Sequence, residues 1–383
     1  MRYVHKILFV FAIIIFLGMI SFPLVQMVWQ PFHPRPLDGF ELSATMPKVT
    51  KAAWMTGEYQ KQTLEYVSQN IGFRGYMVRT DNELTLRVFD ELPSGTVPEI
   101  VMGKDEYLFE RAYIDAMYNK PWTPSSILDK KARDLSRFEQ KLAARGVPFV
   151  LLIAPSKASV YPEWIPDKYV RRDLLGKTDY ERILPYLDKY GVSYFDANAF
   201  LVERKSQSDF LSFGKPGTHW SYYGGCLVTS AFMQYLDQQS GEDYLDLSCD
   251  PVKHRNYGEG SDIDLLRTLN IWSEERFMKD IVTPTIRWSQ QGKMLEEVLW
   301  VGDSFSWVLF DMFEKGPVYK KRDMYYYYST HYGYPEGTQV RIDRSSLDWN
   351  QVSEYDLVVI EATQTAMGQI GFGAVEDALE FLP

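Results

Sequence analysis

The residue with the clearest chemical potential in this sequence is a serine that follows an apolar stretch. Residues 297–301 are typical of a buried strand, and they lead into Gly302-Asp303-Ser304 before a second apolar-periodic stretch begins. We expect Ser304 at the first turn of a helix, where free backbone N–H groups and the helix dipole favour a developing oxyanion. The sequence therefore predicts a nucleophilic serine, although a serine at a helix start is also a common N-cap.

A serine nucleophile needs a base, and only His219 of the five histidines lies in a motif-like setting. It belongs to Gly217-Thr218-His219-Trp220 and precedes Ser304 by 85 residues (304 − 219). Sequence order is no objection, because serine triads recur in unrelated chain orders and are recognised by geometry. We predict that His219 is the base and that Trp220 lies near the site.

Strands and helices alternate along the sequence, as is typical of an α/β domain. The predicted strands are 149–154, 193–196, 297–301 and 356–361, with a short hairpin at 101–109, and the clearest predicted helices are 125–142 and 179–190. We expect a mostly parallel sheet flanked by helices. In such sheets the reactive groups gather at the carboxyl ends of the strands, where Ser304 and Glu361 both lie.

The N-terminus contains one stretch that is long enough to cross a membrane. Residues 7–29 carry no charged side chain, and Arg2 and Lys6 precede them. This length suits one helix of roughly 20 residues, whereas a signal peptide has a shorter apolar core of about 7–15 residues. Positive charge before the helix predicts a cytoplasmic N-terminus. The expected parts are a membrane anchor at 1–29, a linker at 30–53 and an extracytoplasmic body at 54–383.

The composition argues against some functions. A net charge of −10 and a pI near 5.2 argue against a nucleic-acid partner, which would favour a basic face. No cluster of Cys and His has the spacing of a metal site, so we expect neither a metal nor a soluble cofactor. Cys226 and Cys249 would be able to pair in an exported protein, and buried free thiols are an equal alternative.

Four motifs in order resemble the AlgX/AlgJ type of alginate O-acetyltransferase protein, which has an SGNH hydrolase-like domain. The motifs are residues 103–109, 154–157 with 160–163, 218–220 and 302–306. The resemblance runs from about residue 54 to 361. It implies an SGNH-like domain that places acetyl groups on an extracytoplasmic polysaccharide. It also implies a partner, a membrane-bound O-acyltransferase that supplies the acetyl group.

One position departs from the family pattern. The family places Asp two residues before the histidine, and here that residue is Gly217. The acid that would orient the imidazole is therefore not where the pattern puts it. The candidates to replace it in space are the carboxylates of Asp196, Asp209, Asp262 and Glu361, and a backbone carbonyl would serve weakly. Asp303 is a poor candidate, because it belongs to the Gly-Asp-Ser turn.

Three further residues are predicted to contact the substrate: Lys157, Trp220 and Glu361. Lys157 follows the end of a strand, where it would face an acidic sugar or an acyl oxygen, or would pair with a neighbouring carboxylate. The four tyrosines at 325–328 suggest a sugar-stacking surface. Alternation of core and surface residues along a strand is the commoner explanation of such a run.

The sequence thus predicts a serine O-acetyltransferase. Ser304, deprotonated by His219, would take an acetyl group, and a sugar hydroxyl would then remove it. One alternative is a carbohydrate O-acetyl esterase, which uses the same chemistry with water as the acceptor. The other alternative is an inactive SGNH-like scaffold that binds polysaccharide or the acyltransferase, and Gly217 is its main support.

Overall fold

The structure is a computed structural model that describes residues 2–33, 35–40, 43–118, 122–170, 176–254 and 257–382. The chain forms two compact units, one of Met1–Val97 with Arg267–Glu274 and one of Pro98–Leu266 with Glu275–Pro383. Residues 54–97 group with the N-terminal helix in the first unit. Residues 34, 41 and 42 of the expected linker lie outside the described residues.

The N-terminal part of the first unit is helical. Its first helix, α1 (Arg2–Trp29), contains the apolar stretch His5–Trp29, which is long and apolar enough to cross a membrane. The helices that follow are α2 (Lys51–Thr56), α3 (Glu58–Asn70) and α4 (Arg74–Phe89). The length and composition of α1 suit a membrane anchor or a signal sequence.

A seven-stranded sheet forms the centre of the second unit, in the order β10-β9-β8-β7-β11-β3-β4. The five strands from β8 to β4 are parallel, and β9 and β10 add an antiparallel edge. The strands are β3 (Phe149–Ala154), β4 (Tyr194–Asp196), β7 (Leu295–Gly302), β8 (Tyr319–Tyr326), β9 (Thr330–Tyr334), β10 (Thr338–Arg341) and β11 (Leu357–Thr363). This confirms the predicted mostly parallel α/β sheet.

Alternate residues of the central strands face two opposite layers of helices. In β3, Val150 and Leu152 belong to a core shared with α10 and α12, whereas Leu151 and Ile153 belong to one shared with α6, α8 and α13. These helices are α6 (Ser125–Ala143), α8 (Asp179–Tyr190), α10 (Tyr222–Ser240), α12 (Ser306–Phe313) and α13 (Ala374–Phe381). Because both faces are covered, the strands are continuously apolar in sequence.

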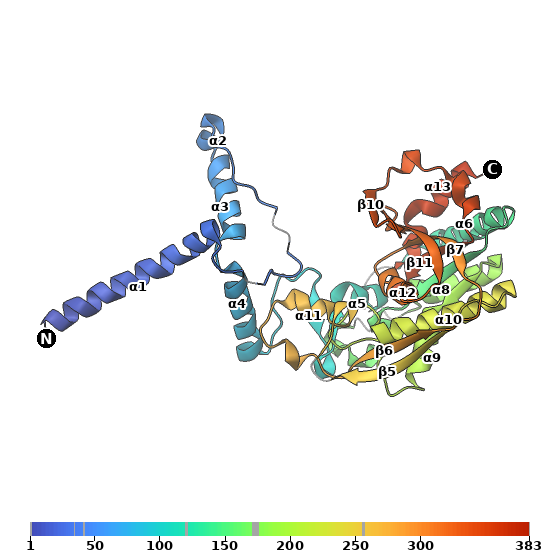
Figure 1. The fold of residues 1–383 in the computed structure, drawn as a ribbon, viewed down its shortest axis with the longest axis horizontal. Helices are drawn as coiled ribbons and strands as arrows, with labels where there is room; N and C mark the ends of the chain where they lie inside the picture. The colour runs from blue at the N-terminus through green and yellow to red at the C-terminus, as the bar shows by residue number, and fades with distance from the viewer. Residues whose placement is uncertain are drawn as a thin grey trace. The chain divides into compact units, whose positions relative to one another are not determined.

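Two small antiparallel pairs complete the second unit. Strands β1 (Ile100–Met102) and β2 (Leu108–Glu110) form the predicted hairpin. Strands β5 (Leu247–His254) and β6 (Ile281–Trp288) pair beside α10, as Figure 1 shows. A disulfide between Cys226 of α10 and Cys249 of β5 joins this pair to the helix, so the cysteines are not free thiols. The remaining α-helices are α5 (Arg111–Tyr118), α7 (Lys157–Val160), α9 (Ala197–Lys205) and α11 (Asp264–Leu269).

Candidate active site

Ser304 lies in the turn between β7 and α12, at the carboxyl end of the parallel sheet. Strand β7 ends at Gly302 and α12 begins at Ser306, so Ser304 precedes the helix instead of lying in its first turn. A glycine is required at 302, because a Cβ there would lie 2.5 Å from Ser306 Oγ and 2.7 Å from Glu361 Oε2. The turn that presents the serine is therefore packed tightly from below.

Asp303 fixes the conformation of this turn. Its Oδ1 accepts the backbone N–H of Phe305 at 2.9 Å. Its Oδ2 accepts the backbone N–H of Thr363 at 3.1 Å and the hydroxyl of the same residue at 2.6 Å. The carboxylate thus joins the Ser304 turn to the end of β11, which is the structural role expected from its place in the motif.

His219 lies in the loop before α10, and its ring bridges Ser304 and a carboxylate. Its Nε2 is 2.7 Å from Ser304 Oγ, and its Nδ1 is 2.5 Å from Asp264 Oδ2. The loop is held beside the serine turn because the indole N–H of Trp220 donates to Phe305 O at 3.1 Å. The structure therefore brings together the two residues that the sequence predicted as nucleophile and base.

The carboxylate on Nδ1 belongs to Asp264, the first residue of α11, which is not among the candidates predicted from the sequence. Its Oδ1 accepts the backbone N–H groups of Thr218 at 2.6 Å and Leu265 at 2.7 Å. Both oxygens are therefore held, and Oδ2 points at the imidazole. Ser304, His219 and Asp264 have the connectivity of a serine triad, in which the acid orients the ring and stabilises the imidazolium.

The four carboxylates considered from the sequence lie elsewhere. Asp196 caps α9, Asp209 is exposed, Asp262 accepts the backbone N–H of Tyr222, and Glu361 accepts that of Asp303. Of these candidates, Asp262 is closest in sequence to the observed acid, Asp264, from which it is two residues away. It is fully buried, and burial raises its pKa to about 7. Nothing in the local sequence separates Asp262 from Asp264, because the choice depends on how this segment packs.

Gly217 explains why the acid comes from a different segment. A Cβ at this position would lie 2.2 Å from Ser261 O and 3.0 Å from Asp262 O. Backbone of the 261–262 segment therefore occupies the space that a side chain at 217 would need. The same segment leads directly into Asp264, so the chain that excludes an aspartate at 217 supplies one from α11.

The surroundings of His219 favour its protonated form. Burial, the largest effect, lowers the pKa of the imidazole. The hydrogen bond and charge of Asp264, together with the charges of Asp303 and Glu110, outweigh burial and raise the pKa above its ordinary value. A more basic imidazole takes the serine proton more readily, and these carboxylates stabilise the imidazolium that results.

Lys157 and Trp220, two of the predicted substrate contacts, lie beneath the site instead of on its surface. Their exposed fractions are 2% and 0%. The amine of Lys157 donates to Leu108 O and Lys215 O, both at 2.8 Å, and not to a carboxylate. Burial lowers the pKa of Lys157 to about 7. The polar groups of both side chains support neighbouring loops.

Glu361, the third predicted contact, is fully buried under the serine turn. Its Oε2 accepts the backbone N–H of Asp303 and the hydroxyl of Ser306, both at 2.8 Å. Burial, followed by the nearby charge of Asp303, raises the pKa of Glu361 well above its ordinary value, which favours the neutral acid. This side chain supports the turn and does not face the surface.

Tyr327 lies beside Ser304, a position that the run of tyrosines at 325–328 did not predict. Strand β8 ends at Tyr326, and both Tyr327 and Tyr328 have positive φ angles, of 48° and 47°, so the expected strand alternation stops there. The backbone N–H of Tyr327 donates to Gly302 O at 2.8 Å, and its hydroxyl lies close enough to Ser304 to affect the Tyr327 pKa. A run of four tyrosines gives no sign of this turn.

The donors beside Ser304 suit a tetrahedral oxyanion. Within the described part of the chain, the backbone N–H of Ser304 has no hydrogen-bond acceptor, and the Tyr327 hydroxyl lies alongside. Donors placed where charge develops lower the barrier of acyl transfer.

As for metals, the described residues contain no group of three or more His, Cys, Asp or Glu side chains that would hold an ion.

Comparisons with known proteins identify one matching family model and several similar solved structures. A family model described as "SGNH hydrolase-like domain, acetyltransferase AlgX" matches residues 100–307. Similar solved structures include the O-acetyltransferase domain of Pseudomonas putida AlgJ, with 19% identity, 71% of this chain and 92% of that chain covered, and a TM-score of 0.45. Pseudomonas aeruginosa AlgX has 12% identity, coverage of 73% and 67%, and a TM-score of 0.43. Bacillus cereus PatB1 has 12% identity, coverage of 70% and 97%, and a TM-score of 0.42. No curated protein matches the sequence.

Proposed function

Because the chain belongs to the AlgX/AlgJ family of SGNH hydrolase-like acetyltransferases, we propose that it transfers acetyl groups to hydroxyl groups of an extracytoplasmic polysaccharide. The observation that carries this proposal is the row of Ser304, His219 and Asp264, with contacts of 2.7 Å and 2.5 Å. A nucleophile, a base and an orienting acid in hydrogen-bond contact are the parts that an acyl-enzyme mechanism requires.

In the first half-reaction, Ser304 Oγ attacks the carbonyl carbon of an acetyl ester or thioester. His219 Nε2 takes the hydroxyl proton, and Asp264 stabilises the imidazolium. The Ser304 backbone N–H and the Tyr327 hydroxyl donate to the oxyanion. When the intermediate collapses, the bond to the donor group breaks, the imidazolium gives that group its proton, and acetyl-Ser304 remains.

In the second half-reaction, a sugar hydroxyl removes the acetyl group. Its proton passes to His219 Nε2, its oxygen attacks the acetyl carbon, and the Ser304 Oγ–carbon bond breaks. The proton then returns to Ser304, and the sugar leaves as its acetyl ester. Water in place of the sugar would give an esterase, so the acceptor decides which reaction occurs.

The N-terminal helix suits a site outside the cytoplasm. Helix α1 is proposed as an uncleaved anchor, with the catalytic body exported. The disulfide between Cys226 and Cys249 supports this location, because disulfides persist in oxidising compartments. We propose a membrane-bound O-acyltransferase as the partner that supplies acetyl groups to the anchored enzyme, which then transfers them to the polysaccharide.

The scaffold alternative has lost its main support. It rested on Gly217, where the family pattern has an acid, and Asp264 occupies the position on Nδ1 that this acid would fill. An inactive scaffold would not need the nucleophile, the base and the acid of a hydrogen-bonded triad.

The proposal is tested with Ser304→Ala in cells that make the acetylated polysaccharide. Polysaccharide acetyl content should fall to background at matched protein level, and Ser206→Ala, at an exposed serine, should leave it unchanged. Normal acetyl content in the Ser304→Ala strain would refute catalysis. With the purified protein, acetyl release measured with and without an acceptor glycan separates transfer from hydrolysis.

A further inference from the structure

Helix α11 belongs to both compact units of the chain. Its first three residues, 264–266, group with the second unit, and residues 267–274 group with the first. Asp264 stands at the start of this helix, about 7.5 Å along the axis from Leu269 at its end, since each residue adds about 1.5 Å. A group that fixes the end of α11 therefore affects the position of Asp264 through little more than one helical turn.

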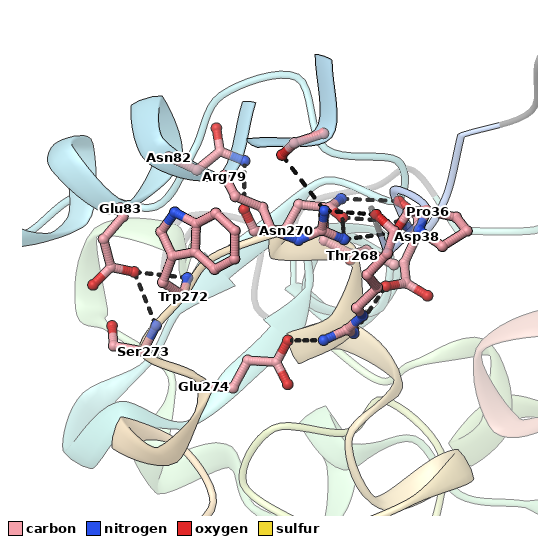
Figure 2. Close-up of polar contacts among 12 residues, drawn as sticks. Pro36, Asp38, Arg79, Asn82, Glu83, Thr268, Asn270, Trp272, Ser273 and Glu274 are labelled. Atoms are coloured by element: carbon pink, nitrogen blue, oxygen red, sulfur yellow. Dashed lines mark hydrogen bonds and ion pairs between the residues drawn. The ribbon is translucent and has the colours of Figure 1, made fainter. Parts of the chain in front are cut away.

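Asn82 of α4 holds the end of α11 (Figure 2). Its amide nitrogen donates to Leu269 O at 2.8 Å and to Asn270 O at 3.2 Å. Carbonyl groups in the last turn of a helix have no partner within the helix, so a side-chain donor fixes where the helix stops.

Glu83, the next residue of α4, holds the segment that follows. Its Oε2 accepts the backbone N–H groups of Trp272 at 2.9 Å and Ser273 at 3.0 Å, as Figure 2 shows. Burial raises the pKa of Glu83, but hydrogen bonds, chiefly from Arg87 and Ser273, outweigh it and lower the pKa to about 2. The side chain is therefore ionised at neutral pH, and charged acceptors make the stronger hydrogen bonds.

The segment is also fixed through the side chain of Asn270. Its Oδ1 accepts the backbone N–H of Asp38 at 3.0 Å, and its amide donates to Asp38 O at 3.0 Å. A guanidinium nitrogen of Arg79, again on α4, lies 3.4 Å from the same Oδ1. Asn270 has a positive φ of 48°, so these contacts hold the chain in a sharp turn directly after α11.

The other end of α11 lies against the loop that carries His219. The N–H of Leu266 donates to Pro216 O at 3.1 Å, and Asp264 Oδ1 accepts the N–H of Thr218. The helix is therefore fixed at both ends, by the His219 loop at the first turn and by α4 after the last.

We propose that Asn82 and Glu83 are positioning residues for the triad, which hold α11 and through it keep Asp264 on His219. This inference rests on the proposed function. Displacement of a catalytic group by about 1 Å is enough to cost as much as 100-fold in rate.

The proposal predicts a specific change in pH dependence. The charges of Asp264, Asp303 and Glu110 act on the His219 ring, and the charge of Asp264 acts on Lys157. Of the three carboxylates, Asp264 makes the hydrogen bond to the ring that helps to raise the pKa of His219. If α11 shifts, this contribution is lost, the pKa falls, and the neutral base persists to lower pH.

The experiment follows covalent labelling of Ser304 by phenylmethylsulfonyl fluoride in the detergent-solubilised full chain. In this reaction the Ser304 Oγ–sulfur bond forms, fluoride leaves and His219 takes the hydroxyl proton. The labelling rate between about pH 5 and 9 therefore measures the fraction of His219 that is neutral. Glu83→Ala and Asn82→Asp should label about tenfold or more slowly at the plateau. The acidic limb of their pH–rate profile, where the labelling rate falls as His219 becomes protonated, should shift to lower pH by about half a unit or more.

Three variants serve as matched controls. Glu83→Gln retains an oxygen that accepts the two N–H groups and should keep the wild-type limb. Arg87→Gln removes the ion pair with Glu83 but not its backbone contacts, and Asp81→Asn changes an exposed carboxylate beside Asn82. Both should leave the acidic limb where it is. A variant that merely unfolds would lose labelled protein at every pH without moving the limb.

If Ser304 is still labelled in both Glu83→Ala and Asn82→Asp and the acidic limb of the pH–rate profile stays at the wild-type pH, the positioning role is overturned. Failure of the proposed function looks different: the wild-type protein would not label at Ser304, or Ser304→Ala would label equally. If Glu83→Ala is too unstable to purify, Asn82→Asp decides alone.

Discussion

At the level of single residues, opposing electrostatic effects on the His219 pKa are expected to set the pH range of the proposed acetyl transfer. Burial disfavours the imidazolium, whereas Asp264, Asp303 and Glu110 favour it, and the net effect raises the pKa. The nucleophile needs a neutral base. Activity is therefore expected to fall as the pH drops through this raised pKa, above the ordinary histidine value of about 6.5.

Asp264→Asn is the direct test of the acid. The rate should fall by about 100-fold or more, because the amide neither holds the useful tautomer nor stabilises the imidazolium. The pKa of His219 should fall as well, so the acidic limb should move to lower pH. Rates of acetyl release between about pH 5 and 9 check both effects. An unchanged rate would exclude Asp264 as the triad acid.

Glu361 offers a test of the buried support. Glu361→Gln preserves the shape of the neutral acid and should change the free energy of unfolding by about 1 kcal/mol or less. Glu361→Ala leaves the Asp303 N–H and the Ser306 hydroxyl without an acceptor and should cost about 3 kcal/mol or more. Unfolding curves of the two purified variants measure the difference. Equal losses would mean that the carboxyl oxygen is not the supporting group.

At the level of elements, two chain segments share the space around the base. The loop at 214–217 approaches the backbone of 261–262 so closely that only glycine fits at 217. The acid then comes from the start of α11. The position of a triad acid along the chain is therefore free to change while its position in space is kept, because geometry alone defines the triad.

Restoring the family residue should consequently fail. Gly217→Asp would place its Cβ 2.2 Å from Ser261 O, so the 261–264 segment must move away and take Asp264 with it. We expect an activity loss of about tenfold or more. The double variant Gly217→Asp/Asp264→Asn should remain as inactive as Asp264→Asn alone. Recovery of acetyl transfer in the double variant would contradict this account of the packing.

At the level of the whole molecule, the chain combines an apolar N-terminal helix with a disulfide-bonded α/β body. The helix is long enough to act as an anchor, and the disulfide suits an oxidising compartment. Lys6 just before the apolar stretch favours a cytoplasmic N-terminus. All three observations are consistent with a catalytic unit outside the cytoplasm.

Protease added to cells with an opened envelope and an intact inner membrane checks this topology. The body beyond about residue 31 should be cleaved, and a tag at the N-terminus should be protected until the membrane is dissolved. An N-terminal tag that is lost together with the body would indicate the reverse orientation. A body that resists until detergent is added would place it inside the cell.

The sequence by itself determined the parts whose signals are local. The strand at 149–154 and the helix at 179–190 have the bounds that periodicity and flanking residues predicted. The residue types at Ser304 and His219, each at the end of a recognisable motif, predicted a nucleophile and a base. These features could be predicted because hydrophobic periodicity and turn chemistry act over a few neighbouring residues.

Only the tertiary structure decided the parts that depend on packing between distant segments. Asp264 instead of Asp262 reaches the imidazole because the backbone of 261–262 packs against Gly217. Glu361 is buried because Asp303 and Ser306 lie over it, and Tyr327 reaches Ser304 because the chain turns after β8. In each case the deciding contacts join residues that are far apart in sequence, so no local pattern of residue types records them.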